Sequence, residues 1–160
     1  MDKKFEEAKA LTGVSEFHSL FELPVVDIPK IPSVDRCNLR VSLLQEELDE
    51  LKDAIETNDI VAAADAFSDI QYVLSGAILE FGLGAKFADL FAEVQKSNMS
   101  KACKSYDEAL ASQAWYLENK NTESSIIERD GQYLLYRKSD LKVLKSINYY
   151  AADFEKILNS

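Results

Sequence analysis

The sequence is poor in the residues that mark several classes of protein. Its two cysteines, Cys37 and Cys103, have no CxxC spacing, which suits a reduced, cytoplasmic protein. Only 18 basic residues face 28 acidic ones, and the resulting net charge of −10 disfavours binding to nucleic acid polymers. No apolar run is long enough to span a membrane, and residues 1–7 carry acids where a signal peptide is apolar. A cytoplasmic protein that acts on small molecules is therefore the default expectation.

The chain divides into three parts, which we expect to form a single domain over residues 1–160. Residues 1–32 combine a short amphipathic helix, broken at Gly13, with a strap that three prolines keep extended. Residues 33–120 contain no proline and show helical periodicity nearly throughout, so they form the predicted helical core. Residues 121–160 change to a β-rich pattern and form a tail.

Four helices are expected in the central part. The first begins after an N-cap at Ser33, and the second is capped by Asn58 or Asp59 and ends at Gly82. The third and fourth cover residues 85–103 and 105–119.

The tail has the pattern of a β-hairpin. Asp130-Gly131 lies between two runs rich in β-forming residues, which predicts two strands around a tight turn. Residues 142–144 are expected to add a third short strand. The predicted fold class is therefore mainly α, a bundle of four to five helices with a small C-terminal β-hairpin.

Two sets of acidic residues lie within the helical part. Glu47 and Glu50 flank the apolar stripe of the first helix at about 100° per residue, and Glu46 lies at the edge of the same face. Asp65 and Asp69 share one face of the second helix, in a run apolar enough to predict burial over most of its circumference. Because an unpaired buried carboxylate costs several kcal/mol, a cation is expected beside them. Antiparallel packing would bring the two sets together.

Either set of acids could also have a purely structural role. The first set has the spacing of an ordinary solvated helix face, and the second set could pair with Arg36, Arg40 or a lysine. A shared divalent cation accounts for both sets at once. Oxygen ligands without a neighbouring histidine or thiolate select Mg²⁺ or Mn²⁺. The sole histidine, His18, lies in another segment, which disfavours a di-iron bundle.

The acidic runs resemble those of a known family. Residues 43–51 (LLQEELDEL) and 65–73 (DAFSDIQYV) resemble the EExxE and ExxD motifs of the MazG-like all-α nucleoside-triphosphate pyrophosphohydrolases. The resemblance extends to Phe17-His18, to residues 94–101 (VQKSNMSK) and to residues 142–149 (KVLKSINY), and so covers most of the chain. This set is most similar to a bacterial and phage branch labelled phosphoribosyl-ATP-pyrophosphohydrolase-like. The resemblance implies hydrolysis of a nucleoside triphosphate between its α- and β-phosphates, giving a monophosphate and pyrophosphate.

The resemblance also implies roles for individual residues. Glu47, Glu50 and Asp65 would be ligands of Mg²⁺ or Mn²⁺, with Asp69 as a further ligand or as a group that orients one. Glu46 would lie beside the attacking water as a ligand or general base, so Glu46, Glu47 and Glu50 are the expected catalytic residues. The expected substrate-binding residues are Asn98, Lys101, Lys145, Phe17, His18 and Tyr72. Aromatic residues at helical spacing are also typical of a core, and a lysine is also typical of a surface.

One position departs from the family pattern. Ala62 stands where the ExxD motif has its glutamate, and alanine cannot bind a cation. Either Asp69 and Glu46 complete the metal shell, or the chain binds nucleotide with impaired turnover. Three hypotheses follow: a Mg²⁺-dependent pyrophosphohydrolase, a nucleotide-binding or sensing module of the same fold, and a structural helical protein with salt-bridged acids. The apolar second helix and the resemblance both predict a homodimer or a dimer of dimers.

Overall fold

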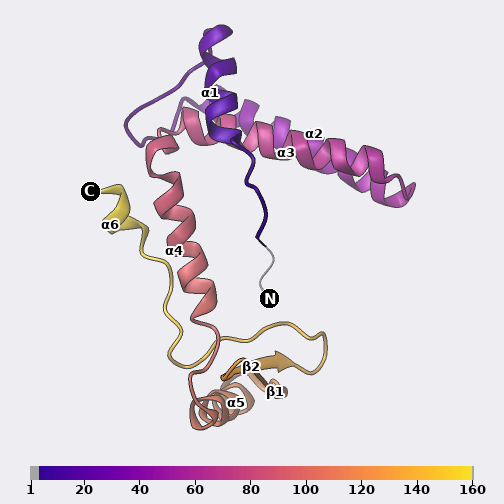
Figure 1. The fold of residues 1–160 in the computed structure, drawn as a ribbon, viewed down its shortest axis with the longest axis vertical. Helices are drawn as coiled ribbons and strands as arrows, with labels where there is room; N and C mark the ends of the chain where they lie inside the picture. The colour runs from indigo at the N-terminus through magenta and orange to yellow at the C-terminus, as the bar shows by residue number, and fades with distance from the viewer. Residues whose placement is uncertain (1–3, 160) are drawn as a thin grey trace. The chain divides into compact units, whose positions relative to one another are not determined.

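The protein is mainly helical, with a small antiparallel hairpin near the C-terminus, which confirms the predicted fold class (Figure 1). The structure is a computed structural model that describes residues 4–159, so residues 1–3 of the charged N-terminal stretch and Ser160 lie outside it. No helix within residues 4–159 has both the length and the apolar character needed to cross a membrane. The elements in chain order are α1 (Ala10–Leu20), α2 (Val34–Glu56), α3 (Ile60–Glu80), the 3₁₀ helix η1 (Gly84–Lys86), α4 (Phe87–Met99), α5 (Tyr106–Lys120), β1 (Ser124–Arg129), β2 (Gln132–Arg137) and α6 (Phe154–Leu158).

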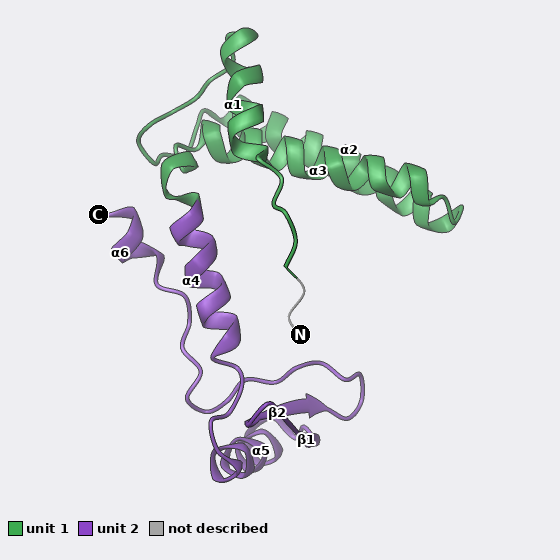
Figure 2. Ribbon diagram, in the orientation of Figure 1, with its two compact units in different colours: residues 1–87 green, residues 88–160 purple. Residues whose placement is uncertain are grey.

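The chain forms two compact units with a boundary after Phe87 (Figure 2). The first contains α1, α2 and α3, and the second contains most of α4, all of α5 and α6, and the hairpin. Each unit is described below by itself. The single-domain organisation over residues 1–160 stays a prediction.

Helices α2 and α3 lie side by side and run in opposite directions, as expected from the short connection between them (Figure 1). The connection turns at Asn58, whose φ of 53° lies in the left-handed region that asparagine tolerates. Asp59 then caps α3, because its side chain accepts hydrogen bonds from the N–H groups of Val61 and Ala62. The turn between α2 and α3 is therefore well defined, and the acid-bearing parts of the two helices lie on either side of it in the chain.

Small side chains line the interface between these two helices. Ala54 on α2 and Ala63 and Ala66 on α3 are all buried, which lets the backbones approach closely. The expected burial of α3 over most of its circumference is wrong for this chain, since Ile60 is 80% and Phe67 59% exposed. Within the first unit, α2 lies alongside the first turns of α3, and the exposed apolar residues lie on the outer side of these turns (Figure 1).

Helix α1 continues through Gly13, so the predicted break at this glycine is wrong. Val14 and His18 lie on one face of α1 and are 1% and 2% exposed, and α1 packs against α3. Burying this face outweighs the cost of about 1 kcal/mol that an interior glycine has relative to alanine.

The proline-rich strap closes the C-terminal end of α3. The N–H groups of Val26 and Lys30 donate to the carbonyls of Leu79 and Phe81, both at 3.0 Å. Carbonyls at the end of a helix lack a donor four residues on, and the strap supplies one to each; Leu79 also accepts from the N–H of Gly82 at 3.2 Å. At Gly82, with φ of +70°, a Cβ would lie 2.2 Å from the carbonyl oxygen of Ile28, and only glycine allows this approach. The extended strap that the three prolines predict is thus bound to the end of α3.

The second unit confirms the predicted hairpin. Arg129 pairs with Gln132, so Asp130-Gly131 forms a two-residue turn in which both residues have positive φ. Of the expected third strand, only Val143 pairs with the sheet, through an isolated bridge to Tyr136. The core of this unit is formed by Cys103, Ala109, Leu135 and Leu144.

Candidate metal and nucleotide site

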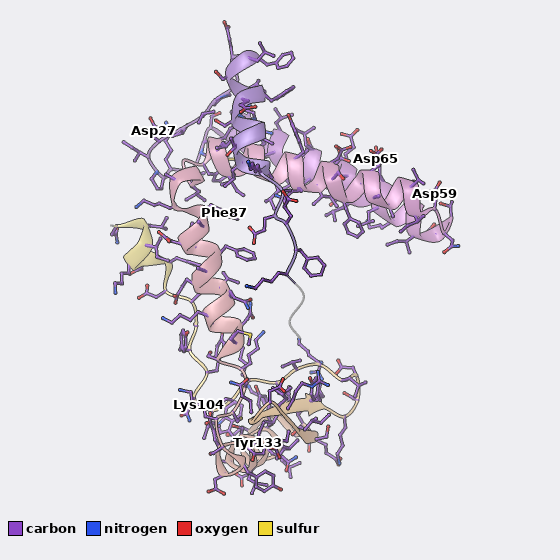
Figure 3. The ribbon with its side chains drawn as sticks, viewed as in Figure 1. Asp27, Asp59, Asp65, Phe87, Lys104 and Tyr133 are labelled. Carbon is purple, nitrogen blue, oxygen red and sulfur yellow. The ribbon has the colours of Figure 1, made fainter. Side chains whose placement is uncertain are left out.

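Five acidic residues come together across the α2–α3 pair. Glu46, Glu47 and Glu50 belong to the middle of α2, and Asp65, labelled in Figure 3, and Asp69 belong to α3. The two sets meet because α2 and α3 are antiparallel and their acids lie at similar distances from the connecting turn. The structure therefore brings together the residues that the sequence suggested as a metal site.

Glu47 is the most enclosed member of this set. Its Oε2 atom is shielded from solvent and has no hydrogen-bond partner among the described residues. Burial raises the pKa of Glu47, and the charges of Asp69, Glu50, Glu46 and Asp65 raise that pKa further. All four neighbours are therefore close enough to repel the Glu47 charge. A cation would relieve both the burial and the repulsion.

The two aspartates are exposed, which corrects the expectation of buried carboxylates on α3. The alternative that Asp65 and Asp69 pair with an arginine or a lysine is also absent, because neither forms an ion pair within residues 4–159. Arg36 and Arg40 bind Glu80 instead. The acids of this face thus have no cationic partner from the described part of the chain.

The five carboxylates are neighbours, but in the described part of the chain they do not form a complete coordination site. Among the described residues, no three histidine, cysteine, aspartate or glutamate side chains are placed to hold a metal ion together. Ala62, in the first turn of α3, contributes only a backbone N–H, which binds Asp59 Oδ1 at 3.0 Å. The donors are all carboxylate oxygens, and the unpartnered Oε2 of Glu47 is one of them. This donor set fits a hard divalent cation such as Mg²⁺ or Mn²⁺.

A buried ionic network, which the sequence analysis missed, joins the end of α3 to the first turns of α2. Glu80 accepts hydrogen bonds from Arg36 and Arg40, and its side chain is 1% exposed. Burial, the largest influence, raises the pKa of Glu80, but the two arginines outweigh it and hold that pKa below its usual range. Arginines four residues apart on α2 and an acid at the end of the apolar α3 were the available signal.

His18 belongs to the same network. Its Nδ1 lies 2.8 Å from the carbonyl oxygen of Pro24, and its Nε2 lies 3.1 Å from Nη2 of Arg40. Because a carbonyl can only accept and a guanidinium can only donate, Nδ1 carries the proton and Nε2 accepts. Both ring nitrogens are occupied and the residue is 2% exposed. These contacts give His18 a structural role, and its predicted contact with substrate stays a prediction.

The aromatic candidates of the first unit form a small exposed cluster. The ring of Phe17 packs against Phe21 at a centroid distance of 4.4 Å and meets Tyr72 edge-on at 5.8 Å. Phe17 is 38% and Tyr72 43% exposed, so both keep ring surface available for a ligand.

The remaining substrate candidates belong to the second unit and gather around Tyr149. Lys101 Nζ donates to Asn98 Oδ1 at 2.7 Å, and Lys145 Nζ lies 4.0 Å from the centre of the Tyr149 ring. The Ser97 hydroxyl, followed by the charges of Lys145 and Lys101, lowers the pKa of Tyr149. The unit thus presents two cations beside a phenol. Sequence reasoning found Asn98, Lys101 and Lys145 but missed Tyr149, which only the fold brings to them.

Comparisons with known proteins agree with these features. The profile of the family described as phosphoribosyl-ATP pyrophosphohydrolase matches residues 14–98, more than half of the chain. This range contains all five acids and ends at Asn98. The chain is also similar to an uncharacterized protein of Acanthamoeba polyphaga mimivirus, with 29% identity over an alignment of 105 residues that covers 63% of this chain. It spans 42% of the length of that relative.

Proposed function

Because this chain belongs to the phosphoribosyl-ATP pyrophosphohydrolase family, part of the MazG-like all-α superfamily, we propose that it hydrolyses nucleoside triphosphates with Mg²⁺. The bond broken would join the α-phosphorus to the oxygen that bridges it to the β-phosphate. Water would add to the α-phosphorus, and the products would be a nucleoside monophosphate and pyrophosphate.

The observation that carries this proposal is the state of Glu47. Its Oε2 is enclosed without a partner while four further acids surround it, and no lysine or arginine pairs with Asp65 or Asp69 among residues 4–159. Like charges gathered without a counter-ion destabilise a fold, so their grouping is better explained by binding than by stability. This weighs against the third hypothesis, a structural protein with salt-bridged acids.

We assign roles to the acids on this basis. Glu47, Glu50, Asp65 and Asp69 would hold Mg²⁺, or Mn²⁺ in its place. When bound, the cation would neutralise phosphate charge and make water a better nucleophile. Glu46, next to Glu47 on the exposed side of α2, would accept the proton of the attacking water.

The substrate-side assignments follow the same proposal. Phe17 and Tyr72 would offer ring faces to the base, with His18 holding the adjoining segment in place. For the second unit by itself, the two lysines beside Tyr149 support the proposal that Lys101 and Lys145 bind phosphate, with Asn98 orienting Lys101.

Ala62 supports a second candidate function. A carboxylate is absent from the first turn of α3, where the family motif has glutamate, and no complete metal cage is present among the described residues. The chain would then bind nucleotide and sense it with little or no turnover.

Exposed apolar residues recur every seven positions on both α2 and α3, and this spacing supports a homodimer. Val41, Leu48 and Ile55 on α2 are 67%, 44% and 66% exposed, and Ile60, Phe67 and Leu74 on α3 are 80%, 59% and 37% exposed. Apolar residues at this spacing pack against helices of a partner. We propose that a second copy covers this exposed heptad surface, with a dimer of dimers as the larger assembly. The two free cysteines, Cys37 and Cys103, are consistent with the proposed cytoplasmic location.

The decisive experiment incubates the protein with each common NTP and dNTP, with and without Mg²⁺, and measures pyrophosphate. Release by the natural chain supports the first function. Release only after Ala62→Glu would show that the missing carboxylate limits turnover. Mg²⁺-dependent nucleotide binding without release, even in Ala62→Glu, would favour the sensing module. No Mg²⁺-dependent binding at all would refute both.

A further inference from the structure

A pocket of 490 Å³ lies between the N-terminal part of α1 and one side of α3, apart from the acids. Its wall includes Lys9 and Gly13 from the α1 side and Phe67, Ser68, Gln71 and Tyr72 from α3. It lies wholly within the first unit. Its size suits a group such as a nucleobase.

The pocket adjoins the acids along α3. Ser68 directly precedes Asp69, and Tyr72 follows Asp69 by three residues, which is about one helical turn. At about 100° per residue, Tyr72 lies on the same side of α3 as Asp65 and Asp69, and Ser68 and Gln71 lie progressively further toward α1. A ligand with phosphates at the acids therefore has the pocket within reach of its base.

Two polar side chains that line the pocket, Ser68 and Gln71, form hydrogen bonds within α3. The Ser68 hydroxyl donates to the carbonyl of Ala64 at 2.8 Å, so it can only accept a further hydrogen bond. The Ser75 hydroxyl donates to the carbonyl of Gln71 at 2.8 Å, so it must accept from Gln71 Nε2 at 3.1 Å. This arrangement fixes the orientation of the Gln71 amide, and it leaves Oε1 as an acceptor and the second hydrogen of Nε2 as a donor.

The pocket also presents ring surface and a cation. Tyr72 is 43% exposed, and its ring is held edge-on by Phe17. Aromatic faces stack on any base. Lys9, at the start of α1, supplies a positive donor on the opposite wall.

We propose that this pocket binds the base of the nucleotide and prefers bases with an exocyclic amino group, an inference that rests on the proposed function. Gln71 Oε1 and Ser68 Oγ are two acceptors that two N–H donors would satisfy, while the remaining Nε2 hydrogen of Gln71 and the Lys9 ammonium can donate to an acceptor of any base. Adenine, cytosine and guanine supply the two N–H donors through their amino groups. Uracil and thymine offer one N–H between two carbonyls, so one acceptor of the pocket would stay unpaired.

The test measures binding of α,β-methylene analogues of CTP and UTP with Mg²⁺ by isothermal titration calorimetry, which does not require turnover. These two ligands differ only in the edge of the base. We expect the cytidine analogue to bind about tenfold more tightly, as one unpaired acceptor predicts. Gln71→Ala should bring the ratio close to one. Equal affinity in the natural protein would overturn the preference for amino-bearing bases.

A pair of variants at Gly13 tests the pocket itself. A Cβ at Gly13 meets nothing within 4 Å, so Gly13→Leu can fill the pocket without straining α1, and Gly13→Ala is the matched control. Gly13→Leu should weaken both nucleotide analogues at least tenfold and leave inorganic tripolyphosphate binding unchanged, while Gly13→Ala should change neither. Thermal melting of each variant establishes that it is folded.

The possible failures are distinguishable. If Gly13→Leu binds both nucleotides as the natural protein does, the pocket does not hold the base and the proposed function stands. If neither tripolyphosphate nor nucleotide binds with Mg²⁺, the proposed function fails and the base pocket fails with it.

Discussion

At the scale of single residues, the enclosed carboxylates of Glu47 and Glu80 have neighbours of opposite charge and pKa values shifted in opposite directions. Glu80 meets two arginines, and its pKa is held below the usual range. Glu47 meets four acids, and burial and these neighbours raise its pKa. The first arrangement stabilises the fold, whereas the second is costly until a cation arrives.

Replacing Glu47 by glutamine should stabilise the metal-free protein. The change removes an enclosed charge from a repulsive group, and we expect the melting temperature at neutral pH to rise by about 2–4 °C, as a gain of about 1 kcal/mol gives in a chain of this size. Mg²⁺ should raise the melting temperature of the natural protein and have little effect on Glu47→Gln. A lower melting temperature for metal-free Glu47→Gln would contradict the repulsion.

The pH dependence of the metal-free protein follows from the same pKa. A raised pKa means that the folded state binds the Glu47 proton more tightly than the unfolded state does. The contribution of Glu47 to stability therefore increases as the pH falls from neutral toward that pKa. Urea denaturation of the natural protein and Glu47→Gln between pH 7 and 5 should show a difference that shrinks with falling pH. A difference in stability that stays constant between pH 7 and 5 would contradict the raised pKa of Glu47.

Loss of Glu80 should be far more damaging. Glu80→Ala leaves Arg36 and Arg40 without their shared partner, and breaking a buried pair in this way costs about 3–5 kcal/mol. Lys52→Ala is the control, because its ion pair with Asp49 is exposed to solvent and should contribute little to stability. Denaturant unfolding measures both, and similar costs would show that the Glu80 network is not a structural centre.

At the scale of elements, two helical glycines have opposite surroundings. A Cβ at Gly76 of α3 would lie 2.7 Å from Nη1 of Arg40 and 3.0 Å from Nε2 of His18, both held in the Glu80 network. A Cβ at Gly13 of α1 meets nothing within 4 Å. Gly76 therefore makes room for the buried ions, and Gly13 has no such packing role.

Replacing each glycine by alanine should therefore change the free energy of unfolding in opposite directions at Gly76 and Gly13. Gly76→Ala should destabilise the protein by about 1–3 kcal/mol through overpacking. Gly13→Ala should stabilise it by about 0.5–1 kcal/mol, because alanine is the better helix former. Urea denaturation measures the free energy of unfolding of both variants. A change in the same direction for both would contradict the packing around Gly76.

At the scale of the whole molecule, the exposed heptad surface of α2 and α3 leads to a prediction about assembly. Val41→Lys places a charge in the α2 repeat and should convert the proposed dimer to monomer, as measured by light scattering coupled to size exclusion. Ser42→Lys, on the same helix but about 100° away, is the control and should leave the mass unchanged. A monomeric natural protein would refute the dimer.

Much of this molecule could be predicted from local sequence. The central helices, the Asp59 cap and the turn at Asp130-Gly131 follow from periodicity and turn chemistry, which act between near neighbours. The spacing of the acids on α2 and α3 likewise indicated their common face. These features depend on backbone geometry that each short segment determines for itself.

Tertiary structure decided which distant groups meet. Only the fold shows that Arg36 and Arg40 bind Glu80, that Asp65 and Asp69 have no ion-pair partner within residues 4–159, and that Glu47 is the acid whose oxygen is enclosed. It likewise carries α1 through Gly13, because packing on α3 outweighs the local preference of glycine. Partner choice among charges depends on burial and on distances between remote segments, and no local pattern encodes those.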